Sequence, residues 1–264
     1  MSAPIALLTD FGSTDVYVGV MKAVISGLAP SSQVIDLGHQ IPPQDVRAAA
    51  AALLFACPYL AAGTVVCCVV DPGVGTERAP LALELETAAG AIYLVCPDNG
   101  VVTPLLGSVR RAVITDDPAF HLPRVSATFH GRDVFAPVSA HLASGVELSA
   151  LGSDKEPGEL VTLPWPRAVG VDRGWRIAVV HVDRFGNLIT NLEGERLREG
   201  RWLVRSGSRS VPALSPTFGA VAVGEPVAYE GSSGFLEIAI RQGNAAAEWG
   251  LGVGDELLVE RVSG

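Results

Sequence analysis

The residues best suited to chemistry begin with Asp71, which ends an apolar run in the stretch VVDPGVGTER at 69–78. A glycine-rich turn follows it, and Arg78 lies seven residues further on. Such a stretch can cradle a phosphate, form a turn closed by a structural ion pair, or contribute half of an active site. It lacks the GK[ST] ending of a Walker loop and the GxGxxG dinucleotide pattern, which argues against phosphate. Spacing alone favours the ion pair, and the active-site interpretation stays open.

A second polar motif, TFHGRD at 128–133, places His130 just before an expected helix. An isolated histidine in such a place is more often structural than catalytic. The sequence contains no HExxH or other short-range pair of zinc ligands, and no GxSxG elbow of a serine hydrolase. We therefore expect no metal site.

The motif VDRFGNLITN at 182–191 combines Asp183 and Asn187 with the aromatic ring of Phe185. A carboxylate and an amide suit the recognition of a ribose or a purine edge, on which the ring can stack. Gly186 followed by Asn187 is equally typical of a hairpin turn between two strands. Both interpretations remain open.

A fourth stretch, EGSSGFLEIAIRQGNAA at 230–246, offers Ser232, Ser233 and Asn244 among several glycines. Glycines let backbone groups approach a ligand closely, but they are also common in ordinary loops. The stretch is therefore a candidate binding segment without a specific chemistry of its own.

Strands and helices that could position these residues alternate in the first part of the chain. Apolar runs predict strands, and apolar residues spaced near 3.6 predict helices. The expected strands are 4–12, 33–38, 63–71, 81–86 and 91–100, and the expected helices are 15–30, 42–60 and 133–145. This alternation is typical of a largely parallel α/β sheet flanked by helices. Ligands bind such sheets beyond the carboxyl ends of the strands, where Asp10, Asp71 and Asp98 fall.

The pattern changes after residue 155. Residues 156–172 are rich in proline and predict a linker. From 173 to 264 the sequence consists of short strand-like runs separated by turn residues, which predicts a smaller all-β, barrel-like domain. We therefore expect an α/β domain at 1–155, a linker at 156–172 and a β domain at 173–264.

Composition limits the class of protein. The 264 residues carry a net charge of −9, which argues against a nucleic-acid partner. We expect neither a signal peptide nor a membrane span, because the N-terminus lacks a basic start and apolar runs stay below about 18 residues. The four cysteines form no CxxC pair, so we expect them to be buried free thiols; they are Cys57, Cys67, Cys68 and Cys96. Free thiols in turn favour a cytoplasmic location.

Seven motifs in order, spanning nearly the whole chain, resemble the S-adenosyl-L-methionine (SAM) hydroxide adenosyltransferases, relatives of the fluorinases and chlorinases. The motifs are LLTDFG, GHQIPPQD, VVDPGVGTER, CPDNG, TFHGRDVFAP, DRFGNLITN and GFLEIAIRQGNAAAEWGL. The resemblance implies an N-terminal α/β domain, a C-terminal β-barrel domain, and a homotrimer with active sites between subunits. It implies that SAM and water give adenosine and L-methionine, with SAM as substrate and no cofactor.

The resemblance also assigns roles to residues of the first domain. Asp71, Arg78 and His130 match the family's water-handling triad. Asp10 matches an acid that resembles a ribose-diol binder, and Phe11 in the same motif is counted with the substrate-binding residues.

In the second domain, Asp183 and Asn187 match residues that hold groups of the methionine or the nucleoside, and Phe185 belongs to the same motif. Ser232, Asn244 and Ala245 match the C-terminal contacts to adenine and methionine. These six residues complete the substrate-binding set that the resemblance implies.

The chain departs from the halogenase pattern at four positions. At the position of Asp71 the halogenases look to have a tyrosine, and at the position of Gly131 they look to have a serine. Both differences favour water over halide as the nucleophile. Gln44 replaces an indole and Ser233 replaces an arginine, so the contacts at these two points stay open. A SAM-dependent halogenase and a SAM- or adenosine-binding module with little turnover remain the alternatives.

The implied reaction is a displacement at the ribose 5′ carbon. Neutral methionine leaves readily from a sulfonium, so the protein's task is to hold one water in line behind that carbon. An imidazole is better matched than a carboxylate to accept a proton at neutral pH. We expect Asp71 to orient the water and Arg78 to fix Asp71, while His130 either completes the network or takes the proton.

Overall fold

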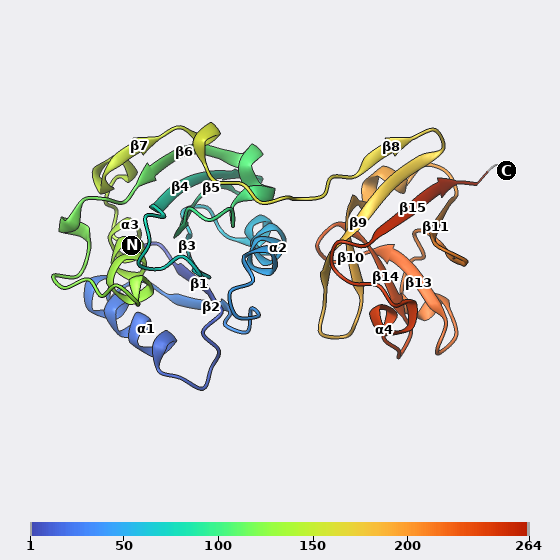
Figure 1. Cartoon of the computed structure of the whole chain (residues 1–264), viewed down its shortest axis with the longest axis horizontal. Helices are drawn as coiled ribbons and strands as arrows, with labels where there is room; N and C mark the ends of the chain where they lie inside the picture. The colour runs from blue at the N-terminus through green and yellow to red at the C-terminus, as the bar shows by residue number, and fades with distance from the viewer. Residues whose placement is uncertain (1, 263–264) are drawn as a thin grey trace. The chain divides into compact units, whose positions relative to one another are not determined.

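The computed structural model describes residues 2–262, and the chain divides into two compact units, Met1–Leu163 and Pro164–Gly264 (Figure 1). Each unit has its own sheet and its own hydrophobic core. The two-domain fold class predicted from the sequence is confirmed.

The first unit is built on a mixed seven-stranded sheet. Four strands in the order β2-β1-β3-β5 are parallel, and β4, β6 and β7 continue the sheet antiparallel. The bounds are β1 Ile5–Thr9, β2 Val34–Gly38, β3 Val65–Val69, β4 Pro80–Thr87, β5 Gly90–Pro97, β6 Val109–Ile114 and β7 Ser153–Lys155. Strands β1 and β3 are buried along their whole length, which explains why they consist of uninterrupted apolar residues.

Helices cover both faces of this sheet (Figure 1). Helix α1 (Tyr17–Leu28) packs beside α3 (Ala136–Ala143) on one face, and α2 (Val46–Ala56) lies on the other. The buried residues of α1 are Val18, Met21 and Ile25, and their spacing of three and four gives the helix one apolar stripe.

The predicted helices are confirmed, with shorter bounds. Asp45 lies just before α2 as its N-cap, and its carboxylate accepts from the Ala48 N–H at 2.9 Å. A π-helical turn, Gly131–Phe135, precedes α3 and begins directly after His130.

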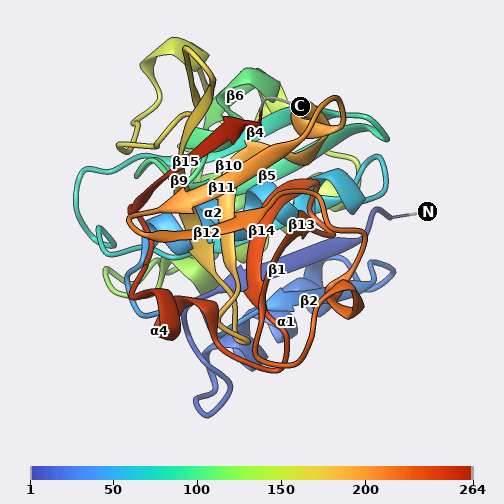
Figure 2. The same ribbon diagram turned by 90° about the vertical axis from the view of Figure 1, so that its right-hand side faces the viewer.

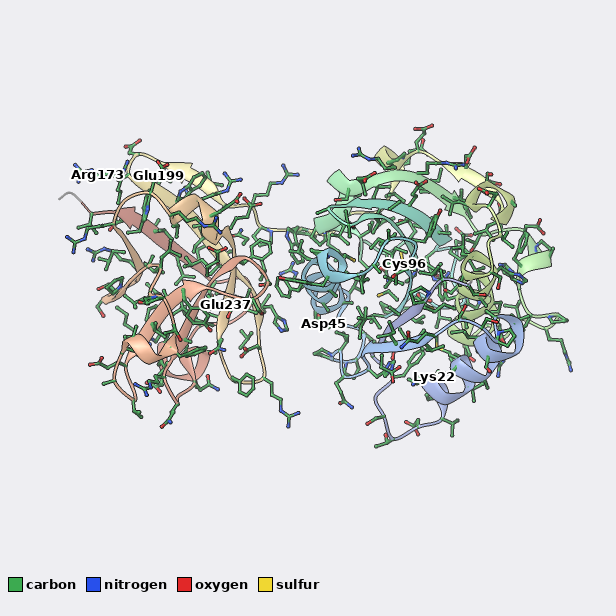
Figure 3. The ribbon with its side chains drawn as sticks, turned by 180° about the vertical axis from the view of Figure 1, so that it is seen from behind. Lys22, Asp45, Cys96, Arg173, Glu199 and Glu237 are labelled. Carbon is green, nitrogen blue, oxygen red and sulfur yellow. The ribbon has the colours of Figure 1, made fainter. Side chains whose placement is uncertain are left out.

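The four cysteines are free and buried, as expected from the sequence. Cys96 lies in the interior of the first unit (Figure 3). Burial raises the pKa of the Cys57 and Cys67 thiols to about 12. Because the thiolate is the reactive form, these residues are inert packing groups at neutral pH.

The second unit is an eight-stranded antiparallel sheet in the order β12-β11-β15-β9-β10-β14-β13, with β8 paired to β9. The end strands β12 and β13 also contact each other, so the sheet curls into a nearly closed barrel around its apolar core (Figure 2). Strand β8 falls within the predicted linker. The bounds are β8 Val169–Val171, β9 Gly174–Val182, β10 Leu188–Glu193, β11 Trp202–Ser206, β12 Arg209–Pro212, β13 Pro226–Glu230, β14 Phe235–Ile240, β15 Glu256–Arg261 and the short helix α4 Ala245–Trp249.

Within residues 2–262, the helices are too short or too polar to cross a lipid bilayer.

Candidate active site

The loop after β3 carries Asp71 and is shaped by its own hydrogen bonds. The Val74 N–H donates to the Asp71 carbonyl at 3.2 Å, and the Thr76 hydroxyl donates to the Gly73 carbonyl at 2.7 Å. Gly75 has a φ of +77°, and a Cβ there would lie 2.4 Å from the Ala127 carbonyl oxygen. Glycine is therefore required for this loop to approach the segment that leads to His130.

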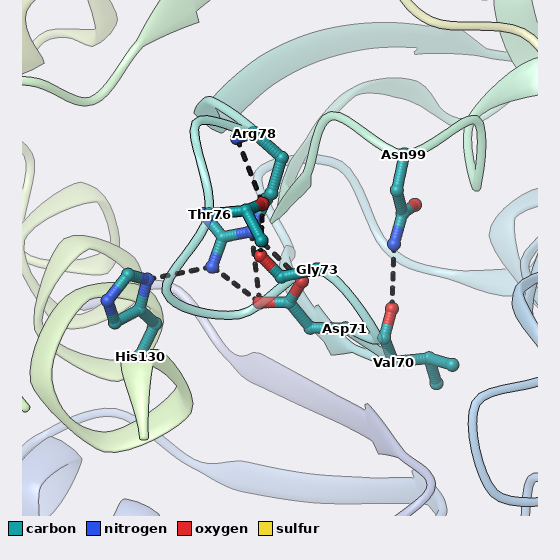
Figure 4. A network of polar contacts seen from close by, with 7 residues as sticks. All are labelled: Val70, Asp71, Gly73, Thr76, Arg78, Asn99 and His130. Carbon is teal, nitrogen blue, oxygen red and sulfur yellow. Dashed lines mark hydrogen bonds and ion pairs between the residues drawn. The ribbon is translucent and has the colours of Figure 1, made fainter. Parts of the chain in front are cut away.

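A second contact fixes the end of the strand itself. The Asn99 side-chain amide donates to the Val70 carbonyl at 2.9 Å, from the loop after β5 to the residue before Asp71 (Figure 4). The neighbouring parallel strand thus holds the backbone from which the carboxylate projects.

The central feature of the site is the guanidinium of Arg78 (Figure 4). Its Nε donates to both Asp71 oxygens, at 2.9 and 3.1 Å, and its Nη2 donates to Asp71 Oδ2 as well. The same Nη2 donates to His130 Nδ1 at 2.8 Å. The side chains of Arg78 and Asp71 are only 8% and 6% exposed, so this ion pair is strongly shielded from water.

The contact with Arg78 determines the state of His130. A guanidinium only donates, so Nδ1 of the imidazole must accept, and the neutral ring carries its proton on Nε2. Burial lowers the pKa of His130, and the positive charge of Arg78 lowers it further. His130 is therefore uncharged at neutral pH.

These residues open onto a cavity of about 370 Å³ in the first unit. Asp10, Phe11, Asp71 and His130, four of the residues singled out in the sequence, line it together. Arg78 contacts two of these lining residues, Asp71 and His130. The cavity thus lies at the carboxyl ends of β1 and β3, where parallel sheets bind their ligands, and its wall combines polar with apolar side chains.

Asp10 is held at this edge by an unusual backbone. Gln44 adopts a φ of +66°, and its N–H donates to the Asp10 carboxylate at 2.7 Å. Gln44 is one of the positions where the chain departs from the halogenase pattern, and it reaches Asp10 through its backbone. The side chain of Gln44 plays no part in that hydrogen bond.

The sequence did not predict three further residues at this edge. Tyr17 and Phe129 line the cavity, and His39 braces the strand end through its ring and its carbonyl. The His39 ring bonds to the Thr9 hydroxyl at 2.9 Å, and the carbonyl of the same residue accepts from the Gly12 N–H at 2.7 Å. Tyr17 is the first residue of helix α1, and its place in the sequence carried no signal of a role at the cavity.

Three candidate residues of the second unit, Asp183, Phe185 and Asn187, lie in the loop between β9 and β10. The Asp183 carboxylate accepts from the backbone N–H groups of Phe185 at 2.9 Å and Asn187 at 2.8 Å. It also accepts from the Asn187 side-chain amide at 2.8 Å. The Phe185 side chain is 75% exposed, so the loop presents an aromatic ring to the solvent.

Asn244 and Ala245 lie against the same loop. A Cβ at Gly186 would fall 2.2 Å from Asn244 Cγ, so Gly186 permits this approach. The Asn244 side chain caps α4 by accepting from the Ala247 N–H at 2.8 Å, and Ala245 is fully buried. Ser232 lies in the turn between β13 and β14.

Across the residues that the structure describes, His, Cys, Asp and Glu side chains form no group of three or more around a point that could hold a metal ion.

Each of the two units matches one domain of the same two-domain protein family. Residues 5–152 match the SAM hydroxide adenosyltransferase N-terminal domain, and residues 177–258 match the C-terminal domain of the same family. The chain belongs to the SAM hydroxide adenosyltransferase family, which confirms the resemblance found in the sequence.

Individual relatives agree with this assignment. The chain is 45% identical to the (R)-S-adenosyl-L-methionine hydrolase of Thermus thermophilus, over 94% of this chain and 96% of the relative. It is 28% identical to the fluorinase of an Actinoplanes species, over 89% and 90% of the two chains. The crystal structure of a conserved protein from Thermotoga maritima superposes with a TM-score of 0.89 at 35% identity, covering 97% of this chain and all of that one.

The buried ion pair gives a test of stability. Replacing Asp71→Asn keeps the size of the side chain but leaves the Arg78 charge without its partner, so unfolding should become easier by about 3 kcal/mol. Urea denaturation measures this change. The matched control is Glu86→Gln, whose partner Arg110 lies 3.9 Å away in a pair that is more than half exposed on the arginine side. We expect the control to cost less than about 1 kcal/mol. Equal losses would show that the Asp71 pair is no stronger than a surface contact.

Proposed function

We propose that the protein hydrolyses SAM, with water displacing L-methionine at the ribose 5′ carbon to give adenosine. The observation that carries this proposal is the Asp71 carboxylate at the wall of the cavity, whose two oxygens both accept hydrogen bonds from Arg78. The Thermus thermophilus relative, named as a SAM hydrolase, supports it over nearly the full length of the chain.

The geometry suits the positioning of a neutral nucleophile. Both Asp71 oxygens accept from Arg78, so the carboxylate cannot rotate freely, and its remaining lone pairs can accept from a water. Holding that water in line with the breaking bond can lower the barrier by up to roughly 7–11 kcal/mol. The oxygen–carbon bond forms as the carbon–sulfur bond breaks, and the electron pair of that bond leaves with the methionine sulfur. The attacking oxygen then loses a proton through Asp71 to solvent.

In this proposal His130 is a positioning residue. Its Nδ1 is engaged by Arg78 and its Nε2 carries a proton, so the neutral ring has no vacant site for a second proton while the contact with Arg78 persists. His130 holds Arg78, and Arg78 holds Asp71. Of the two roles expected from the sequence, completion of the network is the one that this geometry supports.

A halide nucleophile fits the site less well. A carboxylate that projects into the cavity would repel an anion, whereas it attracts the hydrogens of water. We therefore favour hydrolysis over the halogenation named for the Actinoplanes relative.

The remaining proposals follow from the family. The relative's name specifies the (R) form, so we propose that the (R) epimer at the sulfonium is the substrate. We also propose a cytoplasmic homotrimer that uses no cofactor, in which Asp183, Phe185, Asn187, Ser232, Asn244 and Ala245 contribute to substrate binding across subunits.

Isotope labelling tests the reaction directly. When SAM is incubated with the protein in H₂¹⁸O, mass spectrometry should find ¹⁸O in the 5′-hydroxyl of adenosine, because the new oxygen comes from water. Parallel reactions with chloride and fluoride should give no 5′-halo nucleoside. Unlabelled adenosine would contradict displacement by water at the 5′ carbon. Tight SAM binding with no product over hours would favour a binding module.

A pair of variants tests the role of His130. His130→Asn places a carbonyl oxygen near the position of Nδ1, so it preserves an acceptor for Arg78, and we expect kcat within about tenfold of the wild type. His130→Leu removes the acceptor, and we expect a loss of about 10²-fold, typical of disturbed positioning.

The pH profile adds an independent measurement. Protonation of His130 would break its bond to Arg78, and its pKa lies below the ordinary value of about 6.5. Wild-type kcat/KM should therefore stay level down to pH 6.5 and fall only at lower pH, whereas His130→Asn should lack this fall. If the Asn variant is as inactive as the Leu variant, the imidazole itself is required and His130 acts as a base.

A further inference from the structure

Three aromatic rings form one wall of the cavity, and the reaction scheme above gives them no task. Phe11 lies in the loop after β1, Tyr17 begins α1, and Phe129 directly precedes His130. Their centroids are 5.6 Å apart for Phe11 and Tyr17, 5.7 Å for Phe11 and Phe129, and 5.2 Å for Tyr17 and Phe129. Each ring therefore contacts both of the others, and we call them the ring cluster.

A glycine makes the ring cluster possible. A Cβ on Gly131 would lie 3.2 Å from a Phe129 ring carbon, 3.3 Å from a Phe11 ring carbon and 3.3 Å from the sulfur of Met21. A larger residue would force the two rings to give way. Gly131 is also the position where the sequence departs from the halogenase pattern, so this departure sets the shape of the cavity wall.

Two carboxylates line the cavity, and each is already engaged by a hydrogen-bond donor. The Asp71 carboxylate is already paired with Arg78, and Asp10 accepts from the Gln44 backbone. Arg132 lies 5.1 Å from the centroid of Phe129 and is itself paired with Asp133 at 2.6 Å. The ring cluster lines the same cavity as these carboxylates and offers a positive charge a surface that needs no hydrogen bond.

We propose that the ring cluster is the subsite for the sulfonium and its methyl group, and that Tyr17 is a specificity-determining residue for a cationic substrate. A sulfonium neither donates nor accepts hydrogen bonds, so the negative faces of aromatic rings are suited to hold it. This inference rests on the proposed function, because it assigns a part of the same cavity to a part of SAM.

Tyr17 is the best member of the ring cluster for a substitution, since it is 45% exposed and its replacement leaves the hydrophobic core intact. The probes are two unreactive ligands, S-adenosylhomocysteine, which is neutral at sulfur, and an analogue of SAM with a protonated N-methyl amine in place of the sulfonium. Their inhibition constants against SAM hydrolysis, or their dissociation constants by calorimetry, give a preference ratio for the cation.

The wild type should prefer the cationic analogue by about tenfold, within the range of a partly desolvated cation–π contact. Tyr17→Leu should bring the ratio close to one, and Tyr17→Phe, which keeps a ring, should preserve it. Gly131→Ala should also lower the ratio, because the added Cβ displaces Phe11 and Phe129. Adenosine, which lacks the sulfonium, should bind the wild type and Tyr17→Leu equally.

Two results would overturn the inference: an unchanged ratio in Tyr17→Leu, or an equal loss of adenosine binding, which would place the nucleoside on the ring. The failure of the proposed function is a different result. The wild type could prefer the cationic analogue in a ring-dependent way and yet release no adenosine from SAM. That result would support the subsite and contradict the proposed hydrolysis.

Discussion

The site depends on one guanidinium that joins two distant parts of the chain. Arg78 holds both oxygens of Asp71 and also the Nδ1 atom of His130, although His130 follows it by 52 residues. These contacts are charge-assisted because the guanidinium is ionised. Water screens them poorly because Arg78 is nearly buried. The carboxylate and the imidazole thereby acquire fixed orientations and, for His130, a fixed tautomer.

Two glycines allow the backbone approaches that this arrangement needs. Gly75 lets the Asp71 loop lie against the Ala127 carbonyl, and Gly131 lets two phenylalanine rings meet beside His130. The first approach brings the ion pair to the histidine. The second shapes the aromatic wall of the same cavity. Both approaches depend on the lack of a Cβ at these two glycines.

Much of the fold was readable from the sequence because it follows from local periodicity. The uninterrupted apolar runs of β1 and β3 and the helical spacing in α1 depend only on which face of each element is buried. The alternating residues 81–86 predicted a strand, but pairing decides direction, and β4 runs antiparallel within a sheet whose other half is parallel. The ion pair of Asp71 with Arg78 was also predictable, since both residues lie on one loop.

Other parts of the site could not be predicted because they depend on tertiary approach. The bond from Arg78 to His130 joins separate elements, and the place of Tyr17 in the ring cluster depends on how α1 packs. The positive φ of Gln44, which aims its N–H at Asp10, could not be predicted because the residue is not a glycine. The family resemblance suggested a role for His130, and the proposal that it positions Arg78 rests on the hydrogen bond between the two side chains.

The most direct test of this account is the protonation state of His130 in the intact protein. Long-range ¹H–¹⁵N NMR of the histidine side chains, with His130 assigned by its absence in His130→Asn, reports which ring nitrogen carries the proton. At neutral pH the account predicts a neutral ring with its proton on Nε2 and a bare Nδ1 that accepts from Arg78. A proton on Nδ1, or a doubly protonated ring, would contradict it, because Arg78 could then not bridge His130 and Asp71.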